Sequence, residues 1–227
     1  MANVWNLTGH LLYLVDQQRW SKVSVQELKN LAQRFSAEIE GKMVEGSEDV
    51  ARNTAQILPQ DGSVLTHSNS STVLRSLELG FKAGKHFEVF ATESYPGMEG
   101  KQLTKQLIAL GVPVTLIADT RVKAITPNVS LVLVGADSIL GDGSLVHKTG
   151  TRNIGVEAAR HGKPVYSSGE TVKFSVQDFL GDRPKIPAST FDVTPPELIS
   201  TYITEEGQIA PGQVERRLRD LLKKIYP

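Results

Sequence analysis

The first 58 or so residues carry apolar side chains at helical spacing. One apolar series lies within residues 11–15, and a second runs through Val25, Leu28 and Phe35, which fall on one face of a helix. Ser24 precedes the second series and is followed at the third position by Glu27, the pattern of a capping box. The pattern therefore predicts a short N-terminal helical region over residues 1–58.

From residue 59 the pattern changes to short apolar runs that alternate with helical stretches. Strands are expected at 63–68, 87–94, 113–119, 130–137, 164–169 and 198–204, and helices at 73–82, 101–110, 121–125, 153–161 and 212–225. Gly111 and Gly162 end two of these helices, and each is followed by a strand that opens near a proline. Such alternation predicts an α/β fold: a doubly wound, mainly parallel, Rossmann-like sheet over residues 59–227.

Composition narrows the class of protein. The 227 residues hold 25 Lys and Arg against 25 Asp and Glu, so the chain lacks the basic excess of a nucleic-acid-binding surface, and direct nucleic-acid binding is not expected. The absence of cysteine excludes disulfides, thiolate metal sites and a cysteine nucleophile, and fits a cytoplasmic protein. No signal peptide, membrane span, Walker pattern, dinucleotide fingerprint or metal-ligand spacing is recognised, so neither a metal nor a cofactor is expected.

Polar residues follow the first two predicted strands. Ligands of open α/β sheets bind beyond the carboxyl ends of the strands, so these positions carry the candidate chemistry. His67, Ser68, Asn69 and Ser70 stand just before a predicted helix, whose N-terminal amides favour an anion such as phosphate. The alternative is a run of residues that only cap the helix. After the second strand come two candidates for binding sugar hydroxyls, Glu93 and Glu99; either carboxylate can instead be a solvated charge.

Later strand ends offer a candidate acid and a candidate phosphate loop. Asp137 ends the fourth strand, where a partly desolvated carboxyl can shuttle protons, although it can equally cap a turn. The glycine-rich segment 141–155 is expected to be a loop, and its Lys148 and Thr151 precede a helix start that can hold phosphate. His147 is a candidate for ligand binding or proton relay, with a structural histidine as the alternative.

Five stretches in this order resemble one known family. They are LTHSNSSTVLRSLE, TESYPGMEG, VGADSILGDGSLVHKTGT, GETVKFS and FDVTPPELISTYITEEG, and they span roughly residues 59–211. The family joins the α, β and δ subunits of translation initiation factor 2B to isomerases of methylthioribose-1-phosphate and ribose-1,5-bisphosphate. The resemblance implies a Rossmann-like fold, a sugar-phosphate or nucleotide-phosphate pocket, and a homodimer or higher homo-oligomer that uses the FDVTPP segment.

The chain departs from the isomerase branch at several positions that matter for chemistry. The resemblance makes Asp137 the catalytic aspartate, but it places Ser68 where the isomerases carry a cysteine, and serine is a far weaker acid. Tyr95 replaces an arginine, Glu99 replaces a glutamine, and the isomerases' NKxGT phosphate loop survives in part as residues 147–151. No RGA loop is found.

Three hypotheses follow. The first is a protein similar to the initiation-factor subunits that holds a sugar phosphate or nucleotide phosphate through Ser68, Asn69, Lys148 and Thr151, in a regulatory role. The second is an aldose-phosphate isomerase, converting aldose to ketose, in which Asp137 moves the proton and Ser68 or His147 takes the role of the thiol. The third is a scaffold with an empty pocket. The sequence leaves open whether the protein is an enzyme.

Overall fold

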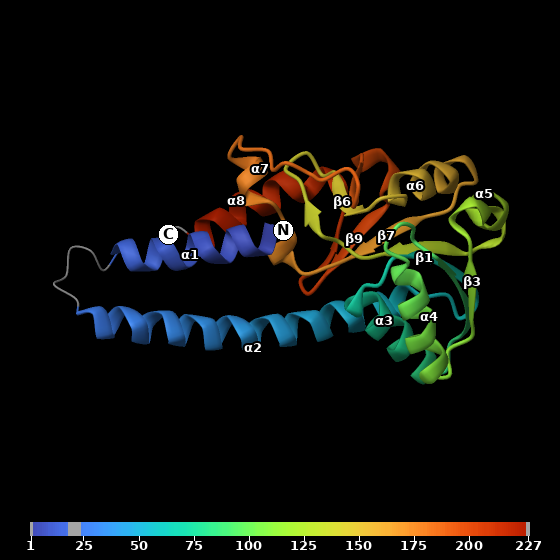
Figure 1. Ribbon diagram of the computed structural model, residues 1–227, viewed down its shortest axis with the longest axis horizontal. Coiled ribbons are helices and arrows are strands. Elements are labelled where there is room, and N and C mark those ends of the chain that lie inside the picture. Colours follow the sequence, from blue (N-terminus) through green and yellow to red (C-terminus); the bar gives the residue numbers. More distant parts are fainter. Residues whose placement is uncertain (1, 18–23, 226–227) are drawn as a thin grey trace.

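Two N-terminal helices lie beside an α/β body (Figure 1). The protein is described by a computed structural model that covers residues 2–17 and 24–225. Helix α1 (Ala2–Gln17) and the long helix α2 (Val25–Ile57) run side by side, and α2 begins at the predicted capping box. The last turns of α2 pack on α3 (Ser71–Lys82), while Asn6 of α1 donates to backbone carbonyls at Val172 and Phe174. The N-terminal region is therefore anchored to the body at both helices.

The body is built on one mainly parallel sheet of seven strands. Their order across the sheet is β10-β9-β7-β4-β1-β2-β3, and only β10 runs antiparallel to its neighbour. The strands are β1 (Asp61–His67), β2 (His86–Thr92), β3 (Val114–Ile117), β4 (Leu131–Val134), β7 (Val165–Ser168), β9 (Thr201–Thr204) and β10 (Gly207–Ile209). The predicted mainly parallel, Rossmann-like sheet is confirmed.

Helices cover both faces of this sheet because its central strands are apolar on both sides. In β1, Val64 belongs to one core cluster and Leu65 to the other, and both side chains are fully buried. One cluster is covered by α3 and α4 (Glu99–Ala109), and the other by α5 (Val122–Ile125), α6 (Thr151–Arg160) and α8 (Val214–Ile225). Continuous apolar strands are the sequence signature of such a doubly covered parallel sheet.

Three predicted helices begin two residues too late. The sequence places their starts at 73, 101 and 153, whereas α3, α4 and α6 begin at Ser71, Glu99 and Thr151. The apolar period becomes visible only after the first turn, whose residues are polar and face the open end of the sheet. The final helix differs in the opposite direction: the sequence places its start at residue 212, but it starts at Val214, after a 3-10 turn at Pro211–Gln213.

A second, smaller sheet was not predicted. It contains the antiparallel strands β5 (Ser138–Ile139), β6 (Leu145–Lys148) and β8 (Phe191–Thr194). The expectation that residues 141–155 form a loop is wrong for β6, whose four residues are all buried. Strands this short carry too little periodicity to be recognised without their partners.

The remaining short elements connect these layers. Helix α7 (Val176–Phe179) and the 3-10 turns η1 (Asp119–Arg121), η2 (Thr126–Asn128), η3 (Thr171–Lys173) and η4 (Pro196–Leu198) lie between strands. Within residues 2–17 and 24–225, no helix has the length and apolar character that a membrane crossing requires.

Candidate functional site

A cavity of about 340 Å³ opens beyond the carboxyl ends of β1 and β4. Its wall brings together seven of the ten residues proposed from the sequence, and it leaves His67, Glu93 and Thr151 outside the lining. The seven are Ser68, Asn69, Ser70, Glu99, Asp137, His147 and Lys148. Lys173, from the turn η3, joins them. Parallel strands end at the same edge of a sheet, which is why positions far apart in sequence meet here.

The start of α3 forms one wall of the cavity. Ser70 caps this helix, because its Oγ accepts a hydrogen bond from the Val73 amide. The first amides of a helix have no partner within the helix, and Ser71, the first helical residue, lines the cavity. A side chain at Gly135 would place its Cβ 2.8 Å from the Oγ of Ser70 and 3.3 Å from Nε2 of His147, so glycine allows β4 to end against this wall. The wall can hold an anion.

An ion pair lines the same cavity. The Nζ of Lys148 lies 2.6 Å from Oε1 of Glu99, and the lysine side chain is only 5% exposed. Glu99 stands in the first turn of α4, and a side chain at Gly97 would collide with its carboxylate. Lys173 is also paired, with Glu170 at 3.0 Å. Both lysines of the wall therefore carry a carboxylate partner.

His147 presents a lone pair to the cavity. Its Nδ1 lies 2.9 Å from Oγ1 of Thr151, and that hydroxyl donates its proton to the carbonyl of Lys148 at 2.6 Å. The hydroxyl has one proton, so it must accept from Nδ1–H, and Nε2 is left as an acceptor. Burial lowers the pKa of His147 to about 3, aided by the positive charge of nearby groups. The ring is therefore neutral at physiological pH.

Both ring nitrogens of His67 make contacts within the chain. Its Nε2 lies 2.9 Å from the carbonyl of Thr149, and its Nδ1 lies 2.6 Å from Oγ1 of Thr92. The ring thus joins β1 to β2 and to the turn after β6. Burial lowers the pKa of His67, which keeps the ring neutral while it makes these bonds. Its absence from the cavity lining agrees with this role.

The N-terminus of α6 is closed by a residue that sequence reasoning missed. The Asp192 carboxylate in β8 accepts hydrogen bonds from the amides of Gly150, at 2.8 Å, and Arg152. Thr151 uses its hydroxyl on His147 and Lys148, so the predicted phosphate loop is already satisfied from within the chain. No local pattern marks Asp192, because its partners lie about 40 positions earlier. An anion at this site is therefore better placed at α3 than at α6.

The two remaining candidates, Glu93 and Asp137, differ in whether they line the cavity. Glu93 is not part of the cavity lining and lies 3.6 Å from Lys101, with the glutamate half-buried and the lysine exposed. Asp137 lines the cavity, and burial raises its pKa, although the positive charges of Lys173 and Lys148 oppose that effect. A carboxyl with a raised pKa beside a cavity can hold and release a proton nearer neutral pH than an exposed one.

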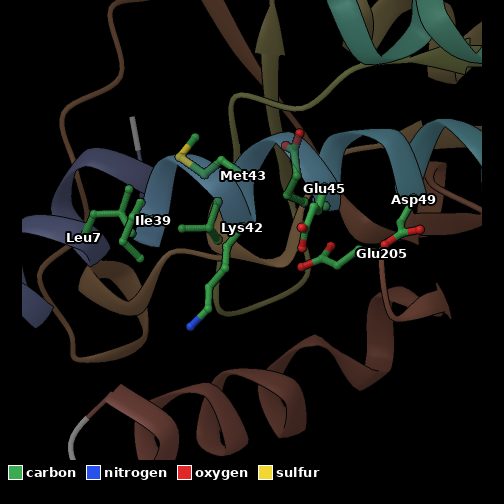
Figure 2. A pocket seen from close by; sticks show the side chains of 10 residues that line it. Leu7, Ile39, Lys42, Met43, Glu45, Asp49 and Glu205 are labelled. Carbon is green, nitrogen blue, oxygen red and sulfur yellow. The ribbon is translucent and has the colours of Figure 1, made fainter. Parts of the chain in front are cut away.

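A second hollow, of about 360 Å³, lies between the two N-terminal helices and the body (Figure 2). Leu7, Ile39 and Met43 give it an apolar floor, while carboxylates gather around it, among them Glu45, Asp49, Glu170 and Glu205. Apart from Lys42, the charged residues of this lining are acidic, so the hollow disfavours phosphate. Within the described part of the chain, no group of three His, Asp or Glu side chains is placed to hold a metal ion.

Comparison with known proteins agrees with this architecture. A family model described as the Initiation factor 2 subunit family matches residues 3–184. The solved structure of translation initiation factor eIF-2B from Pyrococcus horikoshii OT3 superimposes with a TM-score of 0.76 at 30% identity, covering 94% of this chain and 77% of that one.

Curated relatives fall into both branches of the family. Ribose 1,5-bisphosphate isomerase of Haloferax volcanii is 30% identical over 223 residues, covering 88% of this chain and 69% of that protein. The α subunit of translation initiation factor eIF2B from Caenorhabditis elegans is 29% identical over 223 residues, covering 90% of this chain and 71% of that protein. Similarity alone therefore does not choose between an isomerase and an initiation-factor subunit.

Proposed function

Because this chain belongs to the initiation factor 2 subunit family, we propose that its cavity binds a phosphorylated sugar in a regulatory role similar to that of the initiation-factor subunits. The observation that supports the proposal is the cavity itself, which is lined by the start of α3 together with Lys148, His147 and Asp137. Phosphate fits the α3 amides, and sugar hydroxyls fit the acceptor atoms of the other residues. The serine at position 68 supports binding over the isomerases' thiol chemistry.

Ligand-dependent stabilisation tests the proposal. Ribose 5-phosphate at about 100 times its dissociation constant is expected to add roughly 2.7 kcal/mol to the unfolding free energy, while ribose alone adds far less. Lys148→Met should greatly reduce this gain, because it leaves the Glu99 carboxylate without its counter-ion on the cavity wall and makes the cavity more negative for a phosphorylated ligand. Thermal unfolding monitored with and without ligand measures both effects.

Lys101→Met provides the matched control, because Lys101 pairs with Glu93 outside the cavity. This variant should keep the full ligand-dependent gain. A wild-type protein that gains stability from neither ribose 5-phosphate nor a nucleotide phosphate would contradict the proposal. A gain from nucleotide phosphate alone would replace the sugar by a nucleotide as the ligand.

Asp137 favours a second candidate function, that of an aldose-phosphate isomerase. Its half-buried carboxyl has a raised pKa and lines the cavity, which supports a role in moving a proton between sugar carbons. If the wild type converts ribose-1,5-bisphosphate or methylthioribose-1-phosphate to a ketose, Asp137→Asn is expected to lower turnover by at least about 100-fold. Ligand-dependent stabilisation should persist in this variant. A product assay beside the thermal assay separates the two effects.

The melting temperature of Asp137→Asn shows whether this variant is correctly folded. Because burial raises the pKa of Asp137, the charged carboxylate disfavours the folded state at neutral pH, so Asp137→Asn should keep or raise the melting temperature. Full turnover in this variant would exclude Asp137 as the catalyst. The homodimer and the cytoplasmic location expected from the sequence stay predictions.

A further inference from the structure

Two positively charged side chains line the cavity, and each is paired with a carboxylate of the chain. Among the described residues that line it, Lys148 and Lys173 are the only Lys or Arg side chains, and each has a carboxylate within 3.0 Å. His147 is neutral, because burial lowers its pKa to about 3. The start of α3 therefore offers amide donors from which no described carboxylate accepts a hydrogen bond. With both lysines paired and Asp137 also on the wall, the cavity has no spare positive charge for a second phosphate.

The rest of the wall consists of acceptors. Oε2 of Glu99 is buried and has no hydrogen-bond partner among the described residues, while Oε1 of the same carboxylate is held by Lys148. His147, 4% exposed, turns Nε2 into an acceptor through its bond to Thr151, and no described residue donates to Nε2. Acceptor atoms are best matched by donors, and the Glu99 side chain is 35% exposed, so hydrogen-bond donors of a ligand suit this part of the wall. Hydroxyl groups donate, whereas ionised phosphate oxygens do not.

We propose that Glu99 makes this cavity selective for a sugar with one phosphate and free hydroxyl groups, and disfavours a sugar bisphosphate. The inference deepens the proposed function and rests on it. A second phosphate directed at Lys148 would meet the Glu99 carboxylate, and bringing like charges together in a partly dehydrated site is costly. The single phosphate binds at α3, and the sugar hydroxyls donate to Glu99 and His147.

Glutamine at position 99 is the informative change. Glu99→Gln keeps the length of the side chain and one oxygen acceptor but removes the charge that repels a second phosphate. It also leaves Lys148 without a counter-ion, which a second phosphate can then supply. The expected result is a shift of about tenfold or more in relative affinity toward the bisphosphate.

Isothermal titration calorimetry at pH 7.5 with three probes tests the proposal. The probes are ribose 5-phosphate, ribose 1,5-bisphosphate and inorganic phosphate. Wild-type protein should bind ribose 5-phosphate at least about tenfold more tightly than either of the others. Glu93→Gln is the matched control: it removes a carboxylate from the segment that leads into α4 but outside the cavity lining, and it should keep the wild-type order of affinities.

The outcomes separate this inference from the proposed function. Absence of binding to every sugar phosphate would overturn both. Wild-type protein that binds the bisphosphate as tightly as ribose 5-phosphate would overturn the inference alone, and this measurement needs no variant. A Glu99→Gln protein with the wild-type order of affinities would also overturn it. Equal affinity for ribose 5-phosphate and inorganic phosphate would exclude recognition of the hydroxyl groups.

Discussion

Leu133→Ala is expected to lower the unfolding free energy by about 3 kcal/mol. Leu133 is fully buried in β4, between Thr66 of β1 and Tyr166 of β7, in the centre of the main sheet. Truncation removes apolar surface from the core and leaves a cavity that neighbours held by two strands cannot fill. Urea unfolding followed by circular dichroism measures the loss.

The control for this change is Ile108→Ala on α4. Ile108 is 62% exposed, so its truncation removes little buried surface and should change stability by less than about 0.5 kcal/mol. Because β4 also carries the chain to Gly135 and Asp137, Leu133→Ala should weaken ligand-dependent stabilisation as well. A loss below about 1 kcal/mol would contradict the packing of β4 described here.

Lowering the pH from 7 to 5 is expected to reduce the free energy of unfolding through the buried, neutral His147. The unfolded chain binds a proton at His147 with a pKa near 6.5, whereas burial lowers the folded pKa to about 3. Between these values the unfolded state binds more protons, so stability is complete above about pH 6.5 and falls as the pH decreases. From pH 7 to pH 5 the loss from His147 alone is about 2 kcal/mol. The lowered pKa of His67 acts in the same direction.

Urea unfolding at pH 7 and pH 5 checks this dependence. His147→Asn should reduce the loss between the two pH values, since asparagine does not titrate. Replacing the exposed His161 by asparagine is the control and should leave the loss unchanged. Equal stability of the wild type at both pH values would mean that His147 is not buried as a neutral ring.

The sequence by itself determined the layered fold and most of the cavity lining. Apolar runs on both sides of each central strand require helices on both faces, which is why the doubly wound sheet could be predicted. Parallel strands bring their carboxyl ends to one edge, so Ser68 and Asp137 could be assigned to a common site from their positions after apolar segments, and Lys148 from its position before a helix start. The capping box at Ser24 could also be predicted, because it involves residues only three positions apart.

Tertiary structure decided what those residues do. Glu99 neutralises Lys148 across 49 positions, and Asp192 closes the start of α6 across about 40, and no periodicity records such pairs. The short strands of the second sheet depend on partners rather than on their own pattern, so β6 was taken for a loop. Protonation is also a property of the folded state, because burial and one threonine hydroxyl set the charge and the tautomer of His147. Local patterns determine which elements form, whereas long-range contacts and desolvation determine the charge of the site they build.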